Sequence, residues 1–132
     1  MSEDNAKLVR AAWDAWIRGD PQALDFLDDA IAYEDDMLPD HAGETYHGRE
    51  GLLKAWARWA EPWESFETEL EWTREAGDQV VSCHHVRGRG KESGVDMEGR
   101  YAYLWRFRDG KVICLKSCGE VDEALEAAGL SA

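Results

Sequence analysis

Residues 101–115 read YAYLWRFRDGKVICL, and their side chains follow a repeat of two. Every second position of the first half is aromatic, as expected for one face of a β-strand. These positions are Tyr101, Tyr103, Trp105 and Phe107. Asp109-Gly110 is a strong signal for a tight hairpin turn, and the following KVICLKSC reads as a returning strand. The stretch therefore predicts an antiparallel hairpin with one aromatic face.

The period of two extends back to Phe66, whereas the N-terminal half of the chain has the helical period of 3.6. The predicted strands are AIAYED (30–35), 66–72, 79–90, 95–108 and 111–118, and the predicted helices are 4–18, 21–28, 48–61 and 122–130. Residues 37–48, MLPDHAGETYHG, read as a loop. Together the elements predict one α+β domain over residues 1–132: a curved antiparallel sheet with helices covering one face.

Charge pairing suggests how two of these strands align. If paired residue numbers sum to 185, Arg87 faces Glu98 and Arg89 faces Asp96, which is mildly stabilising. The same register sets His84 across from Tyr101 on the opposite, helix-covered face. His84 is then the inward histidine and His85 belongs to the charged outer face.

Composition excludes several classes of function. The net charge of −13 repels phosphate backbones, so nucleic acid is not an expected partner. No apolar run of about 18 residues is present, so the sequence predicts no membrane span, and the acidic N-terminus does not read as a signal peptide. Three cysteines without CxxC spacing indicate reduced thiols and a cytoplasmic location.

The segment VSCHHVRGRGK (81–91) invites a metal-site interpretation that its geometry does not favour. Neighbouring strand residues point to opposite faces, so His84 and His85 cannot both bind one ion. Cys83 and His85 share a face, but two ligands do not make a zinc site. We expect no metal here.

Four segments then carry a family resemblance: AWDAWIRGDPQALDFL, AIAYED, YHGREGLLKAW and YAYLWRFRDGKVICL. Together they resemble the SnoaL-like polyketide cyclases and the ketosteroid-isomerase-like, nuclear-transport-factor-2-like superfamily. The resemblance implies a cone-shaped cystatin-like α+β roll, in which a strongly curved antiparallel sheet is wrapped by N-terminal helices around an apolar pocket. It also implies a homodimer formed through the outer sheet face.

The resemblance can be carried over position by position. The general-base aspartate of the steroid isomerases matches Asp35, in the pair Glu34-Asp35. Their protonated aspartic acid matches Tyr103, whose hydroxyl can also donate to an oxyanion. Their oxyanion tyrosine matches Ala12, which argues against a steroid isomerase. An aspartate that partners a catalytic histidine in the dehydratase branch matches Ile17.

We therefore expect cofactor-independent acid/base chemistry on a small, apolar carbonyl compound. Asp35 is the candidate base, Tyr103 the candidate electrophile, and His84 a second acid/base or orienting group. The expected substrate-binding residues are Trp13, Trp16, Tyr33, Trp56, Tyr101 and Trp105.

Simpler interpretations stay open for each candidate. Asp35 can be a solvated carboxylate, Tyr103 an amphipathic core tyrosine, and His84 a hydrogen-bonded core histidine. The loop histidines His41 and His47 are more often solvated than catalytic. A non-catalytic ligand-binding or dimeric scaffold domain is the alternative function, and a module that binds a partner protein is a third.

Trp59 and Trp63 are assigned to another side of the third helix, 48–61, where they can cover a dimer surface or the base of the cone.

Overall fold

The computed structural model describes residues 2–36, 44–61 and 63–130. In chain order its elements are α1 (Ser2–Ile17), the 3₁₀ helix η1 (Pro21–Phe26), β1 (Leu27–Asp36), β2 (Glu44–His47), α2 (Gly48–Ala60), β3 (Trp63–Ala76), β4 (Gln79–Gly90), β5 (Asp96–Arg108), β6 (Lys111–Cys118) and α3 (Val121–Ala127). No helix among the described residues is long and apolar enough to cross a membrane.

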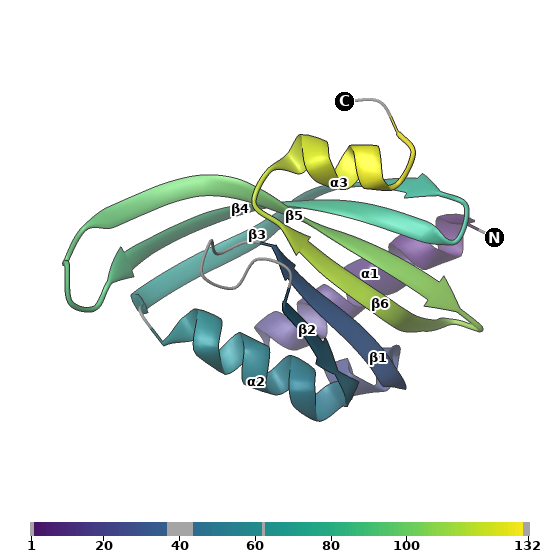
Figure 1. The fold of residues 1–132 in the computed structure, drawn as a ribbon, viewed down its shortest axis with the longest axis horizontal. Helices are drawn as coiled ribbons and strands as arrows, with labels where there is room; N and C mark the ends of the chain where they lie inside the picture. Colours follow the sequence, from purple (N-terminus) through teal and green to yellow (C-terminus); the bar gives the residue numbers. More distant parts are fainter. Residues whose placement is uncertain (1, 37–43, 62, 131–132) are drawn as a thin grey trace.

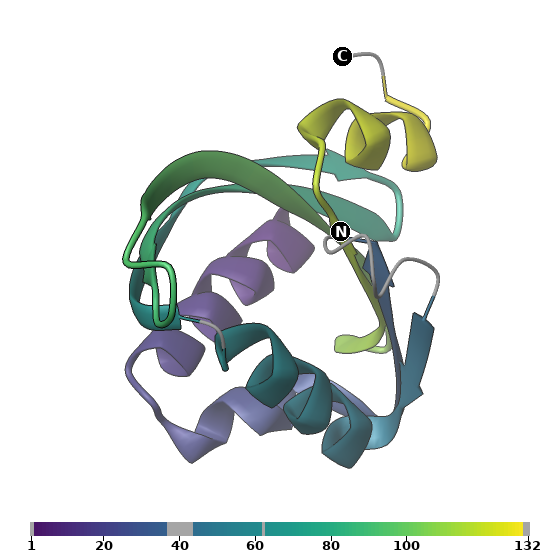
Figure 2. The same cartoon turned by 60° about the vertical axis from the view of Figure 1, so that its left-hand side comes forward.

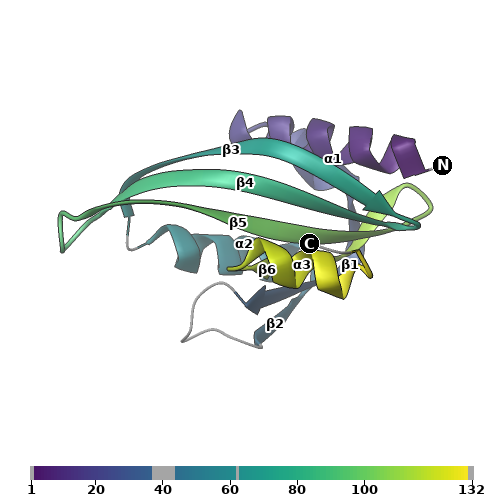
Figure 3. The ribbon, with the colours of Figure 1, turned by 90° about the horizontal axis from the view of Figure 1, so that it is seen from above.

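The six strands form one curved sheet in the order β2-β1-β6-β5-β4-β3 (Figure 1). Figure 2 shows the sheet arching over α1 and α2, with α3 on the opposite side. Seen from above, the long strands β3, β4 and β5 run side by side with α1 along β3 (Figure 3). The architecture confirms the predicted α+β class with a curved, unclosed sheet.

Local signals in the sequence explain several boundaries. Gly19 has φ 71°, a left-handed conformation that suits the end of α1, and Asp20 caps the next helix by accepting from the Gln22 N–H at 2.9 Å. Asp109 and Gly110 have φ 52° and 78°, as a two-residue hairpin turn between β5 and β6 requires. Both predicted signals are confirmed.

The pairing of β4 with β5 follows the predicted register. His84 pairs with Tyr101, Arg87 with Glu98, and Arg89 with Asp96. The inward face of this ladder is largely buried, and its polar groups are those of Ser82 and His84 together with the hydroxyls of Tyr101 and Tyr103. His84 is therefore the inward histidine, as predicted.

Four features differ from the sequence-based expectation. Residues 44–47, expected in a loop, form β2 and pair with β1. Strand β1 runs parallel to β6, so the sheet is not wholly antiparallel. Trp63, which we expected on a face of the third helix, is the first residue of β3. The segment 21–28 is a shorter 3₁₀ turn over residues 21–26.

Helix α3 also departs from the prediction that the helices cover one face. Ala124 and Leu125 are buried against Val81, Ala102 and Cys118, which form a small cluster on the outer face of the sheet. The larger core lies between the inner face and the helices α1 and α2. The sheet is therefore covered on both sides over part of its length.

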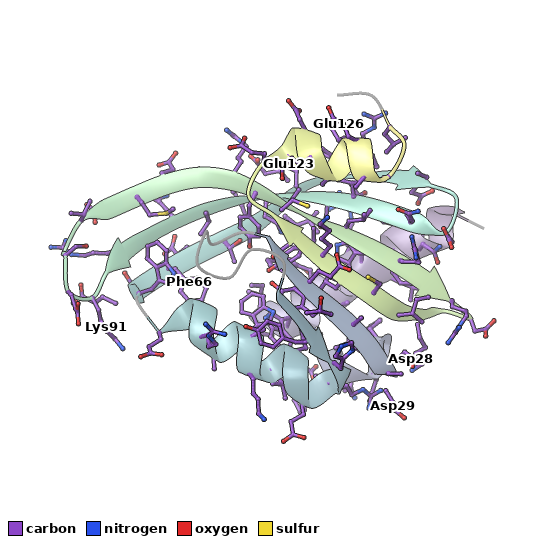
Figure 4. The ribbon with its side chains drawn as sticks, viewed as in Figure 1. Asp28, Asp29, Phe66, Lys91, Glu123 and Glu126 are labelled. Atoms are coloured by element: carbon purple, nitrogen blue, oxygen red, sulfur yellow. The ribbon has the colours of Figure 1, made fainter. Side chains whose placement is uncertain are left out.

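An ion pair and a hydrogen bond attach the start of α2 to β1. Arg49 lies 3.1 Å from Asp29 and donates to the Leu27 carbonyl at 2.6 Å. Figure 4 shows Asp29 and Asp28 at the start of β1, beside the first turn of α2.

Candidate functional site

An apolar cavity of about 30 Å³ lies between the inner face of the sheet and the helices. Among the described residues that line it, only Tyr103 carries a hydroxyl group. The lining residues are Ala12, Trp13, Trp16, Ala23, Leu27, Leu52, Trp56, Tyr103, Trp105 and Leu115. Trp16 of α1 and Trp56 of α2 are half-buried, with ring centroids 5.1 Å apart. The cavity therefore has a largely aromatic wall, in which Tyr103 is the residue that carries a hydroxyl group.

His84 lies next to this cavity, enclosed by aromatic rings. Its ring centroid is 4.2 Å from that of Trp13 and 5.2 Å from those of Tyr101 and Tyr103. The side chain is 0% exposed, and burial lowers its pKa from 6.5 to about 3. The imidazole is therefore neutral at physiological pH.

One ring nitrogen of His84 is hydrogen bonded and the other is not. Nε2 lies 2.7 Å from the Ser82 hydroxyl oxygen, which also accepts from Trp105 Nε1 at 2.7 Å. Nδ1 is buried and has no hydrogen-bond partner among the described residues. Buried polar atoms without a partner are uncommon, and each calls for an explanation.

Two tyrosine hydroxyls and a threonine form a second polar chain. Tyr101 and Thr68 lie 3.0 Å apart through their oxygen atoms, and Tyr101 is also hydrogen bonded to the Tyr103 side chain. Burial raises the pKa of Tyr101 to about 12, against the weaker lowering effect of these hydrogen bonds. Tyr101 therefore stays protonated at neutral pH, as a hydrogen-bond donor or acceptor but not as a base.

The proposed base, Asp35, belongs to β1 and pairs through its backbone with Ser117 and Glu44. Its side chain lies outside the described part of the structure. Ile31 and Tyr33, which precede it at alternate positions, are buried in the main core.

The other residues predicted for the pocket occupy several places. Tyr33 and Tyr101 are buried but do not line the cavity. His47 is exposed at the end of β2. His41 and the side chain of Trp59 fall outside the described residues.

The outer face of the sheet carries basic side chains of β4 and β5, which include His85, Arg87, Arg89 and Arg100. His85 lies 3.0 Å from Glu98, and Arg100 donates to Glu71 at 2.6 Å. The hydrogen bonds from these partners lower the pKa of both Glu98 and Glu71. Among the described residues, no group of three or more His, Cys, Asp or Glu side chains could hold a metal ion. This face is a ladder of charge pairs.

Two polar residues of the interior were not identified from the sequence. Ser82, which the predicted register sets across from Tyr103, was given no role, and Thr68 was not singled out. Ser82 did leave a signal, because it shares with His84 the otherwise apolar inward face of β4. A buried indole such as that of Trp105 also needs an acceptor, which a nearby hydroxyl can supply.

A surface groove meets the interior at one residue. The groove runs between α1 and β3, has a volume of about 390 Å³, and includes Arg10, Asp14 and Thr68 among its lining residues. Trp13 lines both this groove and the inner cavity. Trp13 is therefore shared by the walls of the two spaces.

Comparison with known proteins gives a consistent family but no activity. The family model for a SnoaL-like domain matches residues 9–114. No curated protein matches the chain.

Solved structures share the fold at low identity. An NTF2-like protein from Burkholderia thailandensis is 22% identical, with a TM-score of 0.76 over 94% of this chain and 95% of that chain. A putative SnoaL-like polyketide cyclase from Jannaschia sp. is 18% identical, with a TM-score of 0.73 over 88% and 85%. A protein of ketosteroid isomerase-like fold from Catenulispora acidiphila, in complex with trimethylamine, is 24% identical, with a TM-score of 0.70 over 93% and 92%.

Proposed function

The chain belongs to the SnoaL-like domain family, and we propose that it is a cofactor-independent enzyme that acts on a small, apolar carbonyl compound. The reaction is proton transfer next to the carbonyl: enolisation, isomerisation or an aldol-type cyclisation. The observation that carries the proposal is Tyr103, a buried hydroxyl in the wall of an aromatic cavity, next to a neutral histidine.

The proposed roles follow from the charge that develops during enolisation. Removal of a proton next to a carbonyl places negative charge on its oxygen, and a hydrogen-bond donor in a dry site stabilises that charge. Tyr103 is assigned as this donor, with Tyr101 and Thr68 hydrogen bonded behind it. Asp35 is assigned as the base that removes the proton.

Binding requires the interior to open. Ligand pockets usually have volumes of about 300–1,000 Å³, far above the cavity of about 30 Å³. The groove of about 390 Å³ already lies in that range and shares Trp13 with the cavity, so the proposal is that displacement of the Trp13 side chain opens the cavity to the groove. The ligand then stacks on the remaining aromatic wall, formed by Trp16, Trp56 and Trp105.

The family and its neighbours support a small-molecule site. One structural neighbour is described as a putative polyketide cyclase, and another was solved with trimethylamine bound. At these identities the neighbours support the fold, and the reaction assigned to this chain rests on its own residues.

The direct test is hydrogen–deuterium exchange at the α-carbon of an apolar ketone. In D₂O, wild-type protein is expected to accelerate deuterium incorporation into 2-tetralone, followed by NMR. Asp35→Asn should lower the rate by about 10²–10⁴-fold, and Tyr103→Phe by about 10²–10³-fold. Arg87→Gln, on the outer face, is the control and should exchange at the wild-type rate.

Binding of 2-naphthol, a phenol that resembles an enolate, separates binding from catalysis. Asparagine imitates the protonated base, so Asp35→Asn is expected to bind naphthol more tightly than wild type, and Tyr103→Phe more weakly. Calorimetry measures both affinities. Equal affinities in the three proteins would remove Asp35 and Tyr103 from the site.

The small cavity favours one alternative, a non-catalytic ligand-binding or scaffold domain. In that case neither the wild type nor any variant accelerates deuterium exchange of the ketone above the rate in buffer, whether or not naphthol binds. The two functions therefore differ in a single measurement.

A homodimer through the outer sheet face and a cytoplasmic location complete the proposal. No disulfide joins the three cysteines, all of which lie in the described part of the chain, as expected in a reducing compartment. The outer face carries pairs of opposite charge, such as Arg100 and Glu71, that a second copy can match after a two-fold rotation. Sedimentation equilibrium is expected to give twice the chain mass, and Arg100→Glu to give monomers. A monomeric wild-type protein would refute the dimer.

A further inference from the structure

Ser82 is a fully buried serine between two ring nitrogens. Trp105 Nε1 donates to its oxygen, and His84 Nε2 lies at the same distance of 2.7 Å on the other side. An indole N–H can only donate a hydrogen bond, so the Trp105 indole uses a lone pair of the Ser82 oxygen. The indole cannot accept the hydroxyl hydrogen of Ser82, which therefore needs another acceptor. The direction of this hydrogen decides the state of His84.

Two neutral arrangements of the pair are possible. If His84 carries its hydrogen on Nε2, it donates to Ser82, and both the serine hydrogen and His84 Nδ1 lack partners among the described residues. If His84 carries its hydrogen on Nδ1, the serine donates to Nε2, and only the Nδ1–H group lacks a partner. The second arrangement leaves one fewer buried polar group unsatisfied, and such groups are costly.

We infer that Ser82 and Trp105 hold His84 in the neutral Nδ1–H tautomer, so that it meets the ligand as a hydrogen-bond donor and not as a base. Ser82 and Trp105 are then positioning residues. This inference rests on the proposed function for its ligand, and it narrows that ligand to one with an acceptor oxygen, such as a carbonyl or an enolate.

Access to the imidazole depends on Trp13. The indole centroid is 4.2 Å from that of His84, and His84 itself lines neither the cavity nor the groove, so a ligand reaches the imidazole only if Trp13 moves. In this proposal the acceptor oxygen of the ligand pairs with the Nδ1–H group, which has no partner among the described residues. An alkylammonium ligand would place a donor against a donor, and we expect it to bind less well.

The tautomer can be read in the free protein by NMR with ¹⁵N-labelled histidine. Correlations from the carbon-bound ring protons identify the nitrogen that carries hydrogen, and loss of one signal set in His84→Gln assigns His84. Wild type is expected to show Nδ1–H. Ser82→Ala should populate Nε2–H, and Ser82→Thr, which keeps the hydroxyl, should restore the wild-type pattern.

Ser117→Ala is the matched control, because it removes another fully buried serine hydroxyl, from β6, and should leave the His84 pattern unchanged. Nε2–H in the wild type, or pure Nδ1–H in Ser82→Ala, would overturn the inference. If Ser82→Ala does not fold, Trp105→Phe, which removes the donor to Ser82 and makes the buried ring smaller, is expected to increase the Nε2–H population.

The ligand is tested separately with 2-naphthol. Binding should move the His84 Nδ1–H resonance, and Ser82→Ala should weaken binding by about 10-fold, as loss of one oriented hydrogen bond predicts. Binding without a change at Nδ1 would refute the ligand contact but leave the proposed function standing. Absence of binding would count against the proposed function, while the tautomer would still be decided by the free protein.

Discussion

Burial of His84 among aromatic rings makes its protonation compete with folding. The side chain is 0% exposed, and burial lowers its pKa from 6.5 to about 3. The unfolded chain therefore binds this proton more readily than the folded protein does. The contribution of neutral His84 to stability is fully present above about pH 6.5 and is lost as the pH falls toward 3.

The free energy of unfolding is accordingly expected to fall by about 1.4 kcal/mol per pH unit as the pH drops from 6 to 5, the slope for one extra proton in the unfolded state. His84→Gln should have a shallower slope over this range. Urea denaturation at pH 7, 6 and 5 measures both slopes. Glu71 and Glu98, whose pKa values are lowered, lose their contributions only below about 4.5, outside this window. Equal slopes would show that His84 is already accessible to protons in the folded protein.

At the scale of single elements, the hairpin between β5 and β6 depends on the left-handed conformation of its turn. Gly110 has φ 78° and no atom within 4 Å of where a Cβ would lie, so a side chain there meets conformational strain but no clash. Gly110→Ala is expected to destabilise the protein by about 1 kcal/mol. Gly99→Ala is the control, because Gly99 has equal space and no positive φ. Thermal denaturation should show a lower Tm for Gly110→Ala and little change for Gly99→Ala; equal changes would remove the turn as the cause.

Helix α3 is held to the outer sheet face by a small apolar cluster. Leu125 is 5% exposed and packs with Val81, Ala102 and Cys118. Leu125→Ala should destabilise the protein by about 2–5 kcal/mol, as for other buried leucines. Leu53→Ala, on α2 with 43% of its side chain exposed, should change stability by less than about 1 kcal/mol. Similar losses in both variants, measured in urea, would mean that α3 is not anchored by this cluster.

For the whole molecule, the features that could be predicted from the sequence are those determined by residues close together in the chain. The Asp109-Gly110 turn, the bounds of β4 and β6 and the β4–β5 register followed from turn residues, alternation and charge pairs. The parallel pairing of β1 with β6 did not, because it joins segments far apart in the chain. The inward position of His84 was predictable from the register, but its bond to Ser82 depends on side-chain conformations that no periodicity specifies.

The net charge of −13 is a property of the whole chain, and we expect it to lower the stability of the folded state. The excess acidic side chains repel one another more strongly in the compact folded state than in the unfolded chain. Salt screens that repulsion. We therefore expect Tm to rise by a few degrees between 0.02 M and 0.3 M NaCl, since about 1 kcal/mol corresponds to about 2–8 °C for domains of this size.

A single charge reversal on α3 tests the origin of this salt effect. Glu126 is exposed in the last turn of α3 (Figure 4), where a negative charge also opposes the helix dipole. Glu126→Lys should raise Tm at low salt and reduce its further rise with NaCl, because it removes two units of negative charge. The exposed ion pairs of the outer face are screened as well, but pairs of this kind contribute little. A Tm that falls with salt in the wild type would instead show that these pairs outweigh the repulsion between the acids.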